Sequence, residues 1–406
     1  MPSGGEKVNL YPGMRKFCSW SLTLSLTLFF GCVTAPYTER SQLMLVSESQ
    51  EVGLGAEAYR QTLRDSVVSD NAEALRIVRK VGERIARAAN KPDYRWEFRV
   101  VDDPDMVNAF CLPGGKVAVY TGIFPVAKDE AGLAVVLGHE VAHALLRHAG
   151  ERMSQAQLVG TGLGLVGASG INPQIVQALG LGASVGLILP FSRSQESEAD
   201  RVGLILMAKA GYDPRVALQL WERMERREKG APPEFLSTHP SYETRTHQLR
   251  GFIQEALTYY HPVERELEPL PPLQELESPK ARMERDLLKR IHGVNRLAQE
   301  KQGERAVVDA LSYNLRMDLT SVAQERQQLR LGYGQYAALR GLSYLGRSSL
   351  RQVMVDYQNG TRWHDLSESN GGRLTELISW MSDLQRTALE FQGQPRGGPL
   401  FPRRVR

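Results

Sequence analysis

The spacing of apolar and polar positions predicts helices and strands over most of the chain. Within residues 70–89, apolar residues recur every three or four positions, which indicates an amphipathic helix with Asp70 as its N-cap. Residues 94–100 alternate strictly and predict a half-buried strand. Residues 116–121 predict a second strand, which follows a Pro-Gly-Gly turn signal at 113–115.

Further along the chain, the pattern predicts mainly helices. Residues 131–148 and 192–211 each form an apolar helical segment, and residues 214–229 form a third with proline near its start. Residues 158–190 are rich in Gly, Leu and Val but interrupted, so we expect two short helices or a mobile hairpin there rather than a membrane span. The predicted fold class is α+β, mainly helical, with a small β-sheet.

The N-terminal segment has the pattern of an export signal. Basic residues precede an apolar run at 21–30, which is too short to cross a bilayer of ~30 Å as a helix. Cys32 follows a glycine, so we expect a bacterial lipoprotein signal over 1–32, with Cys32 lipidated and the chain held at a membrane surface. The alternative is a plain signal peptide or retained anchor in which this cysteine is incidental.

Composition predicts a globular chain of several parts. The 406 residues are 42% hydrophobic with three cysteines, which excludes a disordered chain and a disulfide-stapled miniprotein. The net charge of +4 gives no sign of a concentrated basic face, so no nucleic-acid partner is expected. We expect this order after the signal: a tether at 33–50, a first domain at 51–261, a Pro/Glu-rich linker at 262–280, a helical domain of unknown role at 281–392 and a flexible tail at 393–406.

The pattern His139-Glu140-Val-Ala-His143 carries the candidate chemistry. Four residues of an α-helix turn through about 400°, so both imidazoles project from one face and can hold one Zn²⁺ at about 2.0–2.1 Å. Glu140 lies beside that face, where its carboxylate can take a proton from a water molecule at the metal. The rest of the helix is apolar, and buried charge there is costly unless a metal binds it.

A third metal ligand is expected from the helix that follows. Glu196 and Asp200 are four residues apart and share a helix face, so Glu196 can complete a His₂Glu site while Asp200 accepts a hydrogen bond from His139. Glu198, the other candidate ligand, is expected to be a solvated carboxylate. His148 lies about 180° around its helix from His139, which predicts a solvated or helix-end histidine.

These motifs resemble the HtpX and CAAX-prenyl-protease type of zinc metallopeptidase, including soluble periplasmic members that enhance β-barrel assembly. The resemblance covers about residues 50–255. It rests on blocks in the family's order: 108–110, 113–117, 120–122, 138–143, 192–201, 211–214 and 239–245.

The resemblance implies a zincin-type domain followed by a helical C-terminal domain. It implies that His139, His143 and Glu196 bind one Zn²⁺ per chain and that Glu140 is the catalytic base. The chain would then be a metalloendopeptidase of the bacterial cell envelope, periplasmic and anchored to the outer membrane. Its partners would be exported polypeptides, unfolded or misassembled, and components of outer-membrane assembly.

The resemblance also implies roles for residues outside the ligand set. His239 either gates the metal or stabilises the oxyanion, and Arg245 packs or pairs within the site. The alternative is that both are structural, as an N-cap neighbour and an ion-pair partner. The strand at 116–120 would be the edge along which a peptide lies, with substrate contacts at Asn108, Ala109, Val117 and Val119.

Two other functions are compatible with the same motifs. One is a zinc-binding lipoprotein that acts as a chaperone or assembly scaffold with a latent protease site. The other is an intramembrane prenyl-type protease, which the interrupted hydropathy of the chain disfavours.

Overall fold

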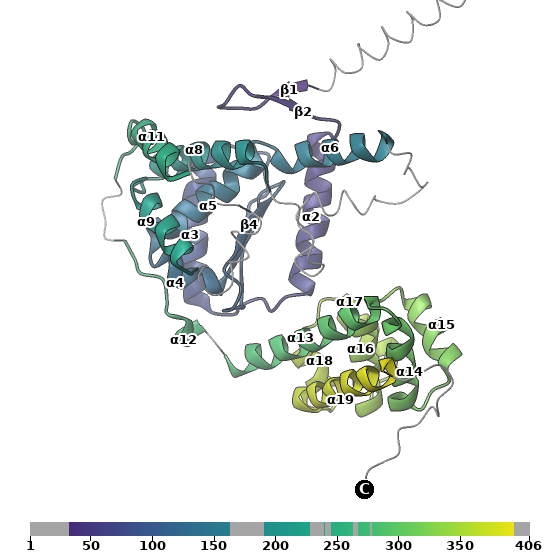
Figure 1. The fold of residues 1–406 in the computed structure, drawn as a ribbon. Helices are drawn as coiled ribbons and strands as arrows, with labels where there is room; N and C mark the ends of the chain where they lie inside the picture. Colours follow the sequence, from purple (N-terminus) through teal and green to yellow (C-terminus); the bar gives the residue numbers. More distant parts are fainter. Residues whose placement is uncertain are drawn as a thin grey trace, which may run out of the picture.

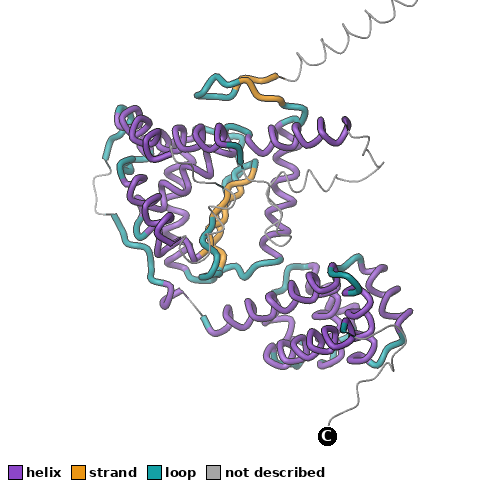
Figure 2. The backbone as a smooth tube through the Cα atoms, in the orientation of Figure 1, coloured by secondary structure: helices purple, strands orange, loops and turns teal. Residues whose placement is uncertain are grey.

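The computed structural model describes residues 32–162, 191–227, 239, 245–262, 267–276 and 278–393. The predicted signal before Cys32, most of the segment 158–190 and the tail after Gly393 lie outside the described residues. The described elements are mainly helical with two small sheets, which confirms the predicted α+β class (Figures 1 and 2). Among the helices described, none combines the length and hydropathy needed to cross a membrane.

The first half of the described chain forms a sheet-containing unit with its own hydrophobic core. Its elements are β1 (Cys32–Thr34), β2 (Ser41–Leu43), α2 (Glu48–Arg64), α3 (Ala72–Ala89), β3 (Glu97–Val101), β4 (Ala109–Leu112), β5 (Lys116–Tyr120), η1 (Thr121–Ile123), α4 (Phe124–Ala127), α5 (Glu130–Leu145), α6 (His148–Gly162), α8 (Arg193–Lys209), α9 (Val216–Arg227), α11 (Arg245–Leu257) and α12 (Leu273–Leu276).

The amphipathic helix expected at 70–89 is α3, and its apolar stripe is buried. Its N-cap is Asn71 rather than Asp70, because the Asn71 side chain accepts a hydrogen bond from the Ala74 backbone N–H at 2.9 Å. Helices α3 and α5 pack together on one side of the three-stranded sheet, whereas α2 lies apart from them (Figure 1). The prediction therefore gave the correct helix with its start displaced by one residue.

The three-stranded sheet has the order β3–β5–β4. Strand β5 pairs in parallel with β3 and antiparallel with β4. The sequence pattern did not predict β4, because this four-residue strand is buried at three positions and shows no alternation. The turn from β4 to β5 uses Gly114 and Gly115 with φ of 87° and 78°, a conformation that favours glycine.

The predicted edge strand is the central strand of this sheet. Both neighbours of β5 are occupied, so the expectation that a peptide lies along 116–120 is wrong. Val117 and Val119 have no exposed surface and belong to the core, so they cannot contact a peptide as predicted. Asn108 and Ala109 lie instead at the start of β4, which is an edge strand beside α5.

The apolar helix predicted at 131–148 is two helices. Helix α5 ends at Leu145, and α6 begins at His148 after a reversal at Arg147, whose φ is 55°. The Gln42 side chain donates a hydrogen bond to the Leu146 carbonyl at 2.8 Å, which satisfies one of the terminal carbonyls of α5. The break changes the direction in which His148 projects.

Residues 33–50, expected to be a polar tether, form ordered structure. Strands β1 and β2 make an antiparallel hairpin, and α2 begins at Glu48 with a capping box between Ser47 and Gln50. Ala35 and Gln42 are almost completely buried against the first unit. The composition of this segment is as polar as that of a tether, but in the structure its polar residues make specific buried contacts.

The predicted linker is packed over part of its length. Leu270 and Leu276 are buried in the core of the first unit, and the Leu270 backbone N–H bonds to the Lys128 carbonyl at 2.8 Å. Glu268 forms an ion pair with Lys80 of α3. Described residues 267–276 therefore lie against the first unit.

The C-terminal residues form a second, all-helical unit with a separate core (Figure 1). Its helices are α13 (Pro279–Gln299), α14 (Gly303–Leu315), α15 (Leu319–Leu329), α16 (Tyr333–Leu345), α17 (Leu350–Gln358), α18 (Trp363–Ser369) and α19 (Leu374–Gln392). Val67, from the segment after α2, is buried in this second core, and Arg285 pairs with Asp102 at 2.6 Å. The two units therefore share a specific interface.

Candidate active site

Helix α5 supplies the first two candidate ligands from a fully buried position. Asp129 caps the helix by accepting a hydrogen bond from the Gly132 backbone N–H, and every residue of α5 is buried. The Nε2 atoms of His139 and His143 lie 3.1 Å apart, so the one-turn spacing brings both imidazoles to one point as predicted.

Helix α8 supplies Glu196. Its Oε1 lies 3.4 Å from His143 Nε2, and its Oε2 lies 3.5 Å from His139 Nε2. The helices approach closely because glycine faces glycine. A Cβ atom on Gly138 would stand 2.7 Å from the Gly203 carbonyl oxygen, and one on Gly203 would stand 2.8 Å from the His139 nitrogen. This crossing places Glu196 within reach of α5.

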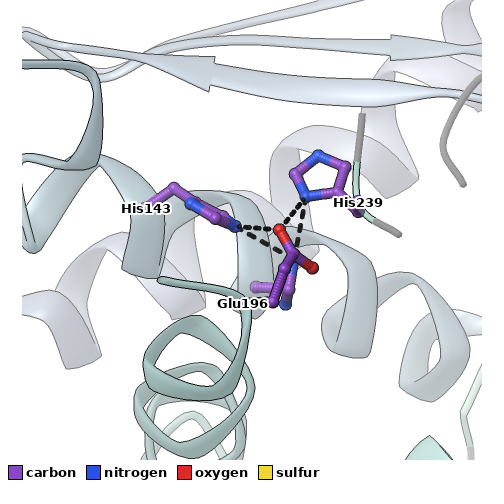
Figure 3. Close-up of side chains that lie close together, drawn as sticks. His143, Glu196 and His239 are labelled. Atoms are coloured by element: carbon purple, nitrogen blue, oxygen red, sulfur yellow. Dashed lines mark hydrogen bonds and ion pairs between the residues drawn. The ribbon is translucent and has the colours of Figure 1, made fainter. Parts of the chain in front are cut away.

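His239 is the fourth member of the cluster, although it lies 96 or more positions from both histidines of α5. Its Nδ1 lies 3.2 Å from His139 Nε2 and 2.9 Å from Glu196 Oε1. Figure 3 shows the imidazoles of His143 and His239 turned toward the Glu196 carboxylate. The structure therefore brings together the three predicted ligands and His239, for which gating the metal and stabilising the oxyanion were both predicted.

These four donors fit a zinc ion. The measured separations between their donor atoms run from 2.9 to 3.5 Å. A tetrahedral ion with bonds of about 2.0–2.1 Å has ligand atoms about 3.3 Å apart. Imidazole nitrogens and carboxylate oxygens are ligands that zinc prefers, so three histidines and one glutamate are a suitable donor set.

The carboxylates around the cluster favour positive charge there. Burial lowers the pKa of His139, but the hydrogen bonds to Asp200 and Glu196 raise it more, to about 9. Burial lowers the pKa of His143 well below its usual value, so this imidazole is neutral, as a metal ligand must be. Burial opposes the charge of Glu196, yet the neighbouring histidines hold its pKa well below the usual range.

Glu140 lies beside the ligand cluster rather than within it. Its Oε1 is buried and lies 3.4 Å from His239 Nε2. Burial raises the pKa of this carboxyl, while the Cys111 backbone N–H of β4 lowers it by hydrogen bonding. A buried carboxylate with a raised pKa, next to a metal cluster and an edge strand, has the properties of a general base.

Asp200 and Arg245 orient one ligand histidine. Asp200 Oδ1 lies 3.1 Å from His139 Nδ1, on the far side of the ring from the cluster. Arg245 donates to both oxygens of Asp200 at 2.9 Å and stacks 3.5 Å above the Trp221 ring. This is the arrangement predicted for Asp200, and it gives Arg245 a place in the site rather than an isolated structural pair.

The expectation of solvated side chains was wrong for both His148 and Glu198, although His148 does stand at a helix end, as the first residue of α6. His148 has no exposed surface, and its Nδ1 lies 2.9 Å from His143 Nδ1. Glu198 is also buried, 3.1 Å from His148 Nε2. The helix break at Arg147 explains the error for His148, because the 180° estimate assumed one continuous helix.

One aromatic side chain near the cluster was missed by the sequence reasoning. Phe191 packs against His143 in a tilted arrangement, with ring centroids 3.9 Å apart, and stacks on His239. The Arg152 guanidinium lies over the Phe191 ring, 3.9 Å from its centroid. Phe191 directly precedes the N-cap of α8, so its place was available only once that helix had been positioned against α5.

Comparison with known proteins agrees with this geometry. The family model described as "Peptidase family M48" matches residues 73–253 of the chain. The chain is 34% identical to the mitochondrial metalloendopeptidase OMA1 of Saccharomyces cerevisiae over 251 residues, which cover 56% of this chain and 70% of that protein. The chain belongs to peptidase family M48. The prediction of a metallopeptidase family is thereby confirmed.

Two further relatives are also named as peptidases. The chain is 38% identical to mitochondrial OMA1 of Schizosaccharomyces pombe, with 54% of this chain and 66% of that protein covered. It is 28% identical to the β-barrel assembly-enhancing protease of Yersinia pestis, with 51% and 44% covered. The chain therefore spans less than two thirds of either relative's length, and their substrates do not transfer to it directly.

The predicted periplasmic, outer-membrane location was wrong. The two fungal relatives are more similar than the Yersinia protein, and both carry mitochondrial names. The prediction rested on the N-terminal pattern of basic residues, an apolar run and a cysteine, together with the resemblance to periplasmic members of the family. The lipidation of Cys32 stays a prediction; in the structure its backbone begins β1.

Proposed function

We propose that this M48 protein is a zinc-dependent metalloendopeptidase. The observation that carries the proposal is the convergence of four buried donors beside the buried carboxylate of Glu140. His139, His143 and Glu196 would hold the ion, with His239 as a fourth donor. A zinc ion bound there supplies a Lewis acid that lowers the pKa of water and polarises a carbonyl.

Glu140 acts as general base and then as general acid. Burial raises its pKa, which makes the carboxylate a better proton acceptor than an exposed glutamate. It takes a proton from the attacking water and passes it to the leaving amine. The Cys111 backbone N–H keeps the carboxylate directed toward the space between β4 and the ligand cluster.

The substrate is proposed to be an extended polypeptide along β4. This strand is an open edge of the sheet, and its residue Cys111 contacts the catalytic carboxylate. A peptide added antiparallel or parallel to an edge strand is held through its backbone, which suits a peptidase that accepts varied sequences. Asn108 remains a proposed contact, whereas the Ala109 side chain is buried in the same core as the two valines and is excluded with them.

His239 would be the fourth donor to an ion held by His139, His143 and Glu196. A catalytic zinc site keeps one position open for water or substrate, whereas four protein ligands make a closed site. With zinc bound by all four residues, His239 would have to leave the ion to admit water or substrate. Its Nε2 lies 3.4 Å from Glu140 Oε1, so this imidazole also contacts the proposed base.

The test is zinc content and hydrolysis of casein by the full chain, with Glu140→Gln as the matched variant. We expect about one zinc per chain in both proteins and a loss of activity of about 10²–10⁴-fold in the variant. Cleavage at the wild-type rate by Glu140→Gln, or a folded protein without zinc, would overturn the proposal.

A second function is favoured by the His239 contact alone. A centre closed by four protein ligands is also what a structural zinc site looks like, so the chain would then be a zinc-binding scaffold with a latent protease site. Stoichiometric zinc with no cleavage in either the wild type or His239→Ala would support this function.

A further inference from the structure

We propose that the N-terminal hairpin (residues 32–43) supports the metal centre from outside it. Arg40 and Thr38 position the ligand His143 through Glu198 and His148. The inference rests on the proposed zinc function. It adds positioning residues that act through a chain of hydrogen bonds and do not touch zinc or substrate.

The chain of contacts begins at the ligand itself. His143 directs Nε2 into the cluster, so its Nδ1 faces away and lies 2.9 Å from Nδ1 of His148. The other nitrogen of His148 lies 3.1 Å from Glu198 Oε2. Because a carboxylate only accepts, His148 carries its proton on Nε2, and its Nδ1 then accepts the proton of His143. This fixes the tautomer in which Nε2 of His143 is free to bind a metal.

The hairpin holds the far end of that chain. Thr38 donates to Glu198 Oε1 at 2.5 Å, and Arg40 Nε donates to Glu198 Oε2 at 2.8 Å. The two remaining guanidinium nitrogens of Arg40 donate to the two oxygens of Glu151 at 2.7 Å each. Arg40 thus joins α8 to α6 in one planar contact, which lysine could not reproduce.

The backbone of the hairpin is shaped for this contact. Tyr37 and Glu39, on either side of Thr38, have φ of 69° and 56°, a left-handed conformation that non-glycine residues rarely adopt. Such strained residues gather at functional sites, where the surrounding contacts hold them. They flank Thr38, whose hydroxyl donates to Glu198, in the hairpin that Figure 1 shows above α8 and α6.

The two histidines of α5 therefore have equivalent supports. His139 is backed by Asp200, which is held by Arg245 from α11. His143 is backed by His148 and Glu198, which are held by Arg40. Each support ends in an arginine from a segment far away in the sequence. Loss of such an orienting partner at other metal sites costs about 10–100-fold in metal affinity.

The test is zinc affinity, measured by competition with a chromophoric chelator on the full chain. We expect Arg40→Ala and Glu198→Gln each to weaken zinc binding about tenfold. Arg40→Lys keeps the positive charge but not the planar guanidinium, and its loss of zinc affinity should be intermediate. Arg60→Ala is the matched control, because Arg60 pairs with Glu57 on the exposed face of α2 and should leave zinc affinity unchanged.

Two measurements separate positioning from general destabilisation. In cobalt-loaded protein, the visible bands of the tetrahedral ion should shift in Arg40→Ala but not in Arg60→Ala. Combining Arg40→Ala with Glu198→Gln should cost no more than either alone, whereas combining Arg40→Ala with Asp200→Asn should multiply the two losses.

Wild-type zinc affinity and cobalt bands in a folded Arg40→Ala and Glu198→Gln would overturn the inference while leaving the peptidase proposal intact. A wild-type chain that binds no zinc would instead overturn the proposed function, and the two failures are therefore distinguishable.

Discussion

At the scale of single residues, the position of His239 has the most direct consequence for activity. Its Nδ1 lies among the donors and its Nε2 faces Glu140, so one ring bridges the ligand cluster and the base. Residues that bridge these two groups decide whether the fourth position is occupied by protein or by substrate.

Replacement of His239 by alanine should open the centre. We expect His239→Ala to retain about one zinc per chain with weaker affinity, and to cleave a short peptide several-fold faster than the wild type, because no side chain then competes for the fourth position. The measurement is the initial rate at matched zinc loading. A large fall in kcat at unchanged KM would show instead that His239 stabilises the oxyanion.

The residue scale is also where the sequence predicted most. The spacing of His139, Glu140 and His143 fixes their relation on any helix, and Glu196 and Asp200 followed from the same rule. His148 and Glu198 could not be placed, because their burial depends on a reversal at one residue and on side chains about 100 to 160 positions away. The local sequence of a polar segment does not indicate such a contact.

At the scale of elements, the crossing of α5 and α8 determines the distance between ligands. Each helix has one glycine at the crossing, and neither position has room for a methyl group. The ligand distances thus depend on two residues that make no contact with the metal.

Gly203→Ala should separate these helices. The added Cβ would stand 2.8 Å from the His139 backbone nitrogen, so α8 must move. We expect a loss of stability of about 1–3 kcal/mol by urea unfolding, together with weaker zinc binding. Gly251→Ala on α11 is the control, since a Cβ there meets nothing within 4 Å. Equal zinc affinities in the two variants would contradict this account of the crossing.

The hairpin contact with α6 predicts a pH dependence of stability. Burial raises the pKa of Glu151, but hydrogen bonds from Arg40 and Gln195 lower it more, so its folded pKa lies below the unfolded value. Its contribution is therefore complete above the unfolded pKa of about 4.3 and disappears as pH falls through the folded pKa.

Urea unfolding of wild type and Glu151→Gln should show this directly. We expect a difference in unfolding free energy that is constant near neutral pH and shrinks below about pH 4.3. Glu57→Gln, at an exposed pair on α2, should show a smaller difference at every pH. A Glu151 difference that grows toward low pH would have the wrong sign for this contact.

Elements were predicted unevenly for physical reasons. Long amphipathic helices such as α3 follow from periodicity alone. Short β4, the α5–α6 break and the β1–β2 hairpin do not, since each depends on tertiary contacts that override local preference. The peptide-binding edge was assigned to the wrong strand for the same reason, because the order of strands is set by the packing of the whole sheet.

At the scale of the whole molecule, the contact between the two units centres on one buried ion pair. Asp102 and Arg285 are 3% and 10% exposed at their side chains and lie 2.6 Å apart. Arg362 adds a hydrogen bond to the Val68 carbonyl at 3.0 Å. The neighbouring pair of Lys289 and Asp105 is exposed.

These two pairs should differ in energy. Arg285→Ala leaves a carboxylate in a buried place, so we expect a loss of about 3 kcal/mol and faster proteolysis between the units. Lys289→Ala, in the exposed pair, should cost less than about 1 kcal/mol. Thermal unfolding of both variants provides the comparison, and equal melting temperatures would argue against a specific interface.

The order of the ligands along the chain has a consequence for synthesis. The first ligand is at position 139 and the last member of the cluster at position 239, while the hairpin that supports His143 precedes both. A chain still on the ribosome carries its HExxH helix for about 100 residues, or about 5–20 s of elongation, before His239 is added. Over the last 43 of those residues, once Glu196 has been added, three donors can hold an ion with nothing to close the fourth position. The nascent chain would then combine an open metal site with an unfolded polypeptide close to it, which is its own unfinished part.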